Sequence, residues 1–75
     1  MSSFVRFILK HKNDATAYGD IARDIMADPD IKRNWGVKTT KNYIEPKASA
    51  NVWATLEELE EMYKDRLRNL YKSLQ

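Results

Sequence analysis

Residues 51–75 read NVWATLEELEEMYKDRLRNLYKSLQ and carry the clearest periodic signal in the chain. Apolar side chains recur there three or four positions apart, at Val52, Leu56, Leu59, Tyr63, Leu67, Leu70 and Leu74. This spacing places them in one stripe along a helix. Carboxylates crowd the first turns and cations the last ones, an order that favours a helix because it complements the helix dipole. The helix begins either near Asn51 or at Thr55, where Thr55 and Glu58 form the pattern of a capping box.

The length and composition of the chain predict one small domain over residues 1–75. The chain has no cysteine, so neither a disulfide nor a thiolate metal site can stabilise it, and its thin core depends on a few large apolar side chains. No apolar run approaches the roughly 18 residues that a membrane span needs. The N-terminal apolar patch is broken by Arg6 and no small-residue cleavage site follows, so no signal peptide is expected. Together these features favour a cytoplasmic protein.

The N-terminal segment predicts a short helix. Ser2 or Ser3 can cap it, since a serine hydroxyl accepts from the free backbone N–H groups of a first turn. Phe4, Phe7 and Ile8 then fall on one apolar face. A run of cations follows, which suits the last turn of a helix.

A second helix is expected from near Thr16 to Asp28, because a proline follows and disfavours helical geometry in the residue before it. Its predicted buried stripe comprises Tyr18, Ile21, Ala22, Ile25 and Met26. Gly19 lies one turn inside this helix, where it weakens the helix by about 1 kcal/mol relative to alanine. We therefore expect another backbone segment to pass close to Gly19.

Residues 30–48 have the least regular pattern. Asp30 can cap a single helical turn over residues 31–34, with Gly36 in the C′ position that ends it. Thr39 or Thr40 can cap another short helix, which a proline stops. The expected core contacts of this helix are Val37, Tyr43 and Ile44. No strand pattern appears in the chain. The sequence therefore predicts an all-α bundle of four to five helices, closed by the long C-terminal one.

Through several of these residues, the first half of the chain resembles the YozE-like family of small bacterial proteins. The resemblance rests on Ser3-Phe4, Phe7, Gly19-Asp20-Ile21-Ala22, Asp24-Ile25, Asp28 and Tyr43-Ile44. It implies a fold like the sterile alpha motif. It implies no reaction, cofactor or catalytic residue, because the family has no established activity. The chain departs from the family pattern at Ala17, where a proline is usual, and in a last helix that extends past Tyr63.

The sequence offers little for catalysis or metal binding. Nucleophilic catalysis needs a nucleophile, a base and an orienting group held together, and the single histidine, His11, lies at a predicted helix end. Two glycines far apart in the chain do not form a phosphate-binding loop. Asp20, Asp24 and Asp28 form a carboxylate row, but three aspartates on one straight helix lack the convergent ligands that an ion needs. We expect no enzyme activity, no cofactor and no metal site.

A basic segment supports one functional hypothesis, nucleic-acid binding. Cations neutralise phosphates, and an exposed aromatic ring can stack on a base. The candidate contacts are Lys32, Arg33, Trp35, Lys38, Lys41 and Lys47. In the competing interpretation, Trp35 covers a thin core and the lysine stems cover apolar surface.

Protein association is the preferred hypothesis. A helix over residues 51–74 would measure about 35 Å, against a diameter of about 30 Å for a compact chain of this size. Its end should therefore overhang the bundle with an uncovered apolar stripe, which invites a partner helix or a second copy. The candidate association surface is Leu67, Leu70, Tyr71 and Leu74. The alternatives are that the N-terminal helix covers this stripe or that the last turn frays. Neither functional hypothesis involves a membrane or a small-molecule substrate.

Overall fold

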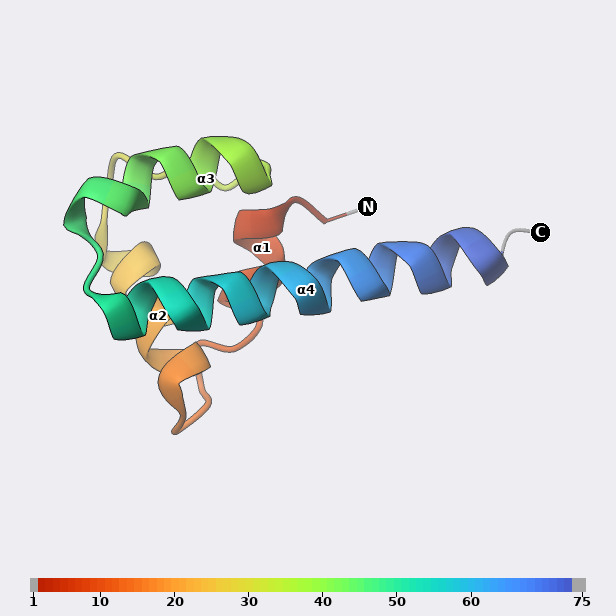
Figure 1. The fold of residues 1–75 in the computed structure, drawn as a ribbon, viewed down its shortest axis with the longest axis horizontal. Coiled ribbons are helices and arrows are strands. Elements are labelled where there is room, and N and C mark those ends of the chain that lie inside the picture. The colour runs from red at the N-terminus through yellow and green to blue at the C-terminus, as the bar shows by residue number, and fades with distance from the viewer. Residues whose placement is uncertain (1, 74–75) are drawn as a thin grey trace.

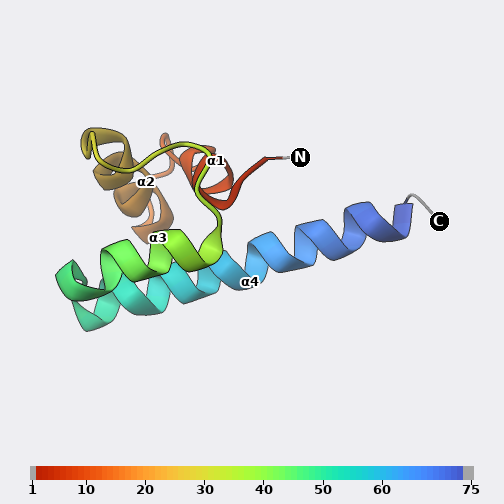
Figure 2. The same cartoon turned by 90° about the horizontal axis from the view of Figure 1, so that it is seen from above.

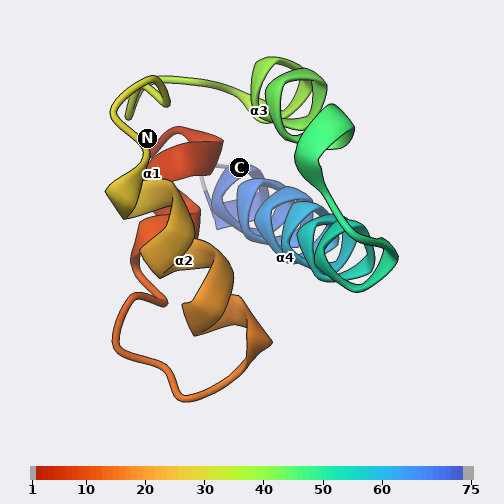
Figure 3. The ribbon, with the colours of Figure 1, turned by 90° about the vertical axis from the view of Figure 1, so that its left-hand side faces the viewer.

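The computed structural model describes residues 2–73, and every regular element in this range is a helix. In chain order the elements are α1 (Phe4–Leu9), α2 (Ala17–Ala27), α3 (Val37–Ile44), the 3-10 turn η1 (Glu45–Lys47) and α4 (Ala50–Ser73). α4 runs the length of the molecule, with α1 and α2 on one side of its first half and α3 on another (Figure 1; Figure 3). The predicted all-α bundle with a long C-terminal helix is confirmed.

α4 begins where Ser49 caps it, because the serine hydroxyl accepts the Val52 N–H at 3.2 Å. Of the two predicted starting points, the one near Asn51 is right. Thr55 lies inside the helix, where its hydroxyl donates to the Asn51 carbonyl at 3.0 Å. It therefore caps nothing, and the helix runs unbroken to Ser73.

The core forms where α1, α2 and the first half of α4 meet. Phe4 and Ile8 of α1 pack in one cluster with Leu56 and Leu59 of α4, and all four side chains are fully buried. Tyr63 closes this cluster, with its ring centroid 5.3 Å from that of Phe4. The apolar stripe of α4 therefore faces the core as far as Tyr63, as the spacing predicted.

α2 packs its predicted stripe against this core with one exception. Ile21, Ala22 and Ile25 are buried, whereas Met26 is 53% exposed, so its prediction as a core residue is wrong. Met26 lies in the last turn of α2, rotated by about 100° from Ile25, at an edge of the stripe that solvent reaches.

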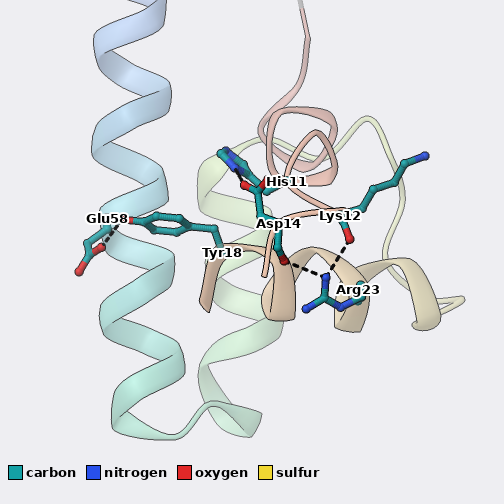
Figure 4. Close-up of polar contacts among 6 residues, drawn as sticks. All are labelled: His11, Lys12, Asp14, Tyr18, Arg23 and Glu58. Carbon is teal, nitrogen blue, oxygen red and sulfur yellow. Dashed lines mark hydrogen bonds and ion pairs between the residues drawn. The ribbon is translucent and has the colours of Figure 1, made fainter. Parts of the chain in front are cut away.

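Gly19 marks a close approach of two backbone segments, as predicted. A Cβ atom at this position would overlap the Asp14 carbonyl, with the carbonyl carbon only 2.8 Å away. Arg23 holds the preceding loop in this place. Its guanidinium donates to the carbonyl oxygens of Lys12 at 2.9 Å and Asp14 at 3.0 Å (Figure 4).

The segment between α2 and α3 differs from the prediction. Residues 31–34 form a bend and a turn rather than a helical turn. The Asp28 carboxylate accepts the Asp30 N–H at 2.9 Å, which organises a local turn directly after α2. Asp30 therefore has no helix to cap.

Gly36 begins a helix instead of ending one. It is the N-cap residue of α3, with extended backbone at φ −84° and ψ −174°. Its carbonyl accepts both the N–H of Thr40 at 3.1 Å and the hydroxyl of Thr40 at 2.7 Å. The predicted caps Thr39 and Thr40 therefore lie inside α3, where the Thr40 hydroxyl is satisfied by the carbonyl four residues before it. α3 ends as expected before Pro46, which lies in η1.

The last turns of α4 project beyond the other helices (Figure 1; Figure 2). The molecule extends 40 Å along its longest axis and 24 and 21 Å across it. The predicted overhang is thus present, because α1 crosses the middle of α4 and does not follow it to its end.

Candidate functional site

The overhanging part of α4, residues 64–73, carries exposed apolar side chains, and we call it the ledge. Leu70 is 41% exposed and Tyr71 is 66% exposed, while Leu67, closer to the bundle, is half-buried. Leu74, the fourth residue of the predicted association surface, lies outside the described residues. The three that are described belong to one helical segment beyond the core.

The ledge begins at the last aromatic contact of the core. The Tyr63 ring lies against both Phe4 and Phe7, with centroids 5.3 Å apart in each pair. The Tyr63 hydroxyl donates to the Ser2 carbonyl at 2.9 Å, which ties α4 to the N-terminus. Beyond this anchor an open groove of about 420 Å³ runs from Phe7 along the ledge to Leu70.

The ledge is basic as well as apolar. Its charged residues are Lys64, Asp65, Arg66, Arg68 and Lys72, four cations against one carboxylate. Lys64 pairs with Glu60 at 2.8 Å, and Arg68 pairs with Asp65. Among residues 2–73, Arg66 and Lys72 make no ion pair. An apolar strip with flanking cations is complementary to an acidic surface that has an apolar centre.

Of the five cations predicted to contact nucleic acid, three are exposed and two contact other side chains of the molecule. Three of the side chains, Lys32, Arg33 and Lys38, are exposed. Lys41 lies against α4, where its ammonium is 2.7 Å from the Glu60 carboxylate and 5.1 Å from the centroid of the Trp53 ring. Lys47 is engaged elsewhere, with its ammonium 3.7 Å from the centroid of the Tyr43 ring. Two of the five cations, Lys41 and Lys47, are therefore held by contacts within the molecule. These two line different hollows of the surface.

Trp35 covers the core. It is half-buried and packs against the core cluster. Its ring meets Tyr43 edge-on, with centroids 5.3 Å apart. Its carbonyl accepts the Val5 N–H at 3.3 Å, which joins the loop before α3 to α1. This arrangement favours the interpretation of Trp35 as a lid over the one that offers its ring to a base.

Charged side chains surround Tyr43 at the end of α3. The Asp28 carboxylate accepts the Asp30 N–H at 2.9 Å and the Tyr43 hydroxyl at 2.9 Å. These hydrogen bonds, the backbone one first, and the nearby Lys47 hold the pKa of Asp28 below its ordinary 3.8. Contact with Tyr43 and the nearby carboxylates raise the pKa of Lys47 above its ordinary 10.5. Both groups are therefore charged at neutral pH.

A small cavity beside these charged side chains was missed by the sequence reasoning. It has a volume of about 180 Å³ and lies between α2, the end of α3 with η1, and the first turn of α4. Its aliphatic walls are Ile21, Ile25, Ile31, Ile44, Ala48 and Val52, and its polar rim is Asp24, Asp28, Tyr43 and Lys47. We call it the isoleucine cavity. No local signal marks it, because its walls come from separate segments and each side chain fits an ordinary core pattern.

His11 and the carboxylate row of α2 make local contacts. His11 Nδ1 lies 2.7 Å from Asp14 Oδ2 within the loop before α2 (Figure 4). Asp20 pairs with Arg23 at 2.7 Å. Over residues 2–73, no three histidine, aspartate or glutamate side chains gather as metal ligands would. In the same range no helix combines the length and the apolar character that crossing a membrane requires.

Comparison with known proteins was made on sequence and on structure. No family model matches the chain, and no curated protein or solved structure matches it. The resemblance to the YozE-like family is not tested by these results and stays a prediction.

Proposed function

We propose that this chain is a non-enzymatic protein-association module that docks its partner on the ledge. The observation that carries the proposal is the exposure of Leu70 and Tyr71 on turns of α4 that project past the bundle (Figure 2). A contiguous apolar strip on the surface of a small domain is a common mark of a binding site. Tyrosine is also among the residues that contribute most to binding energy at interfaces.

The ledge is held in a shape that suits docking. It continues a helix whose first half is fixed by the core, and the Tyr63 hydroxyl bond to Ser2 secures its base. A preordered helix loses little conformational entropy on binding, which strengthens association for a given contact area. The groove between Phe7 and Leu70 offers room beside the helix for apolar side chains of a partner.

The test compares the wild-type chain with two variants that place a carboxylate at an exposed apolar position. Tyr71→Asp alters the ledge, and Met26→Asp alters α2, far from it in the chain. Each form is immobilised and exposed to an extract of the source cells supplemented with free Tyr71→Ala chain, which keeps every surface except the ledge and can therefore be retained only through the ledge of the immobilised chain. We expect at least one protein to be retained by the wild type and by Met26→Asp and to be lost from Tyr71→Asp. Circular dichroism verifies that both variants keep their helices. Identical retention by the two variants would contradict the proposal.

A further inference from the structure

We infer that the ledge of one copy docks head-to-tail on a second copy, with Tyr71 inserted into the isoleucine cavity. This inference rests on the proposed docking function and names the partner and the receiving surface. It follows from the size of the cavity, the chemistry of its rim, the exposure of Tyr71 and the distribution of charge.

The cavity has the size and lining of a receptor for one side chain. Its volume of about 180 Å³ lies below the roughly 300–1,000 Å³ of typical small-molecule sites. The walls are aliphatic, so they would favour the body of an aromatic ring. The rim carries the carboxylates of Asp24 and Asp28, which can accept a hydrogen bond from a hydroxyl at the end of that ring.

Tyr71 is the side chain on the ledge that matches this receptor best. At 66% exposed it is the most accessible of the large apolar side chains described. It has an apolar ring and a hydroxyl tip, in the order that the walls and the rim of the cavity require. Burying such a ring in a pocket is a recurrent source of binding energy at protein interfaces.

One chain cannot fill its own cavity with Tyr71. Val52, a wall of the cavity, and Tyr71 belong to the same unbroken helix. A rise of ~1.5 Å per residue keeps these two residues about 28 Å apart. The occupant must therefore come from another molecule.

Charge favours this pairing over contact between two ledges. Facing ledges would bring together two surfaces on which four cations oppose one carboxylate, and like charges at an interface are unfavourable. The cavity rim instead offers Asp24 and Asp28 against one Lys47. Asp24 is exposed and makes no ion pair among residues 2–73, so it is available to Lys72, the unpaired cation next to Tyr71 in the sequence.

The contact joins opposite ends of the molecule, since Val52 of the cavity and Tyr71 lie near the two ends of α4, and these ends are far apart (Figure 1). Such a heterologous contact leaves one free cavity and one free ledge on every dimer. Copies therefore add to one another in an open chain or a closed ring rather than stopping at a twofold dimer.

The experiment is sedimentation velocity of the full chain from micromolar to hundreds of micromolar concentrations. The wild type should gain mass with concentration beyond a dimer. Tyr71→Ala and Asp24→Lys, both at exposed positions, should each stay monomeric alone. An equimolar mixture of the two should form a dimer and stop there, because it contains one competent ledge and one competent cavity. Glu61→Lys reverses an exposed carboxylate outside both surfaces and should assemble as the wild type does.

Two results would overturn the inference. A wild type that stays monomeric at hundreds of micromolar excludes the second copy as partner, while retention of another protein by the ledge would still support the proposed function. The second result is association that is abolished by Tyr71→Ala but unchanged in Asp24→Lys. It would show that the ledge docks on a surface other than the cavity. Failure of the proposed function itself would show as unchanged retention by Tyr71→Asp.

Discussion

Replacing Gly19 by alanine should destabilise the fold, although alanine is the better helix former. In an unobstructed helix interior the change would stabilise α2 by about 1 kcal/mol. Here the added methyl group would overlap the Asp14 carbonyl, with the carbonyl carbon 2.8 Å away, well inside the ~3.5–4 Å of an unstrained carbon contact. The loop before α2 must retreat, and that loop carries the two carbonyl groups to which Arg23 donates.

The magnitude follows from these contacts. Overpacking of this kind costs about 1–3 kcal/mol. Each Arg23 hydrogen bond that the retreat breaks costs about 1 kcal/mol more, because the separated groups reach water. After the gain in helix propensity, the net loss should be about 2 kcal/mol. That is a large share of the roughly 4–11 kcal/mol expected for a domain of this length, and it should lower the Tm by about 8–16 °C.

Thermal and urea unfolding followed by far-ultraviolet circular dichroism measure this loss. Gly36→Ala is the matched control, since a Cβ atom there meets nothing within 4 Å, and it should cost no more than about 1 kcal/mol at a helix N-cap. Arg23→Ala releases the loop without adding an atom to α2. If Gly19→Ala proved as stable as the wild type, the close approach of loop and helix would be refuted.

Three further predictions test the core, the electrostatics and the alternative function. Leu56→Ala should lower the free energy of unfolding by about 2–5 kcal/mol, because Leu56 is fully buried, whereas Leu70→Ala should lower it by less than about 1 kcal/mol; equal losses in urea unfolding would contradict the division between core and ledge. Hydrogen bonds from Lys41 and, to a lesser degree, from Lys64 lower the pKa of Glu60 below its ordinary 4.5. The ionised carboxylate therefore stabilises the fold above pH 4.5, and this stabilisation is lost as the pH falls through the lowered pKa. The stability difference between wild type and Glu60→Gln should therefore be largest at neutral pH and shrink below about 4.5, and a difference independent of pH would contradict this. Random duplex and single-stranded DNA should show no retarded band at low salt with tens of micromolar protein, because Lys41 and Lys47 are engaged within the fold; a salt-sensitive shift would favour the nucleic-acid hypothesis.

The helices that could be predicted from sequence are those with a period long enough to define a face. The apolar spacing of α2 gave its bounds within one residue, whereas the spacing of α4 left two starts open, of which the one near Asn51 lies one residue from the observed start. Gly19 was informative because a glycine inside a helix weakens it, which requires a compensating reason in the packing. Gly36 was misleading, because glycine is compatible with either end of a helix and nothing local distinguishes the two ends.

The candidate site could be predicted only in part. The ledge followed from comparing the length of one helix with the size of the domain, which needs no tertiary contacts. The isoleucine cavity could not be predicted from the sequence, since Ile21, Ile31 and Ile44 lie in different segments and meet only after folding. The engagement of Lys41 and Lys47 also depends on where α3 lies relative to α4 and α2, which no local pattern states.

The ledge is a consequence of element lengths. α1 has six residues, so its backbone spans only about 9 Å. Within this length, Phe4 and Phe7 already contact Tyr63, so α1 does not extend along α4 beyond that residue. α3 lies along the first half of α4, where Lys41 holds it to Glu60. The stripe beyond Tyr63 keeps the same period as the buried one, yet the helices described here end before they reach it. Because the apolar period continues beyond the helices that cover it, the exposure of this stripe is built into the fold, and this exposure is why we propose that a partner supplies the missing apolar surface.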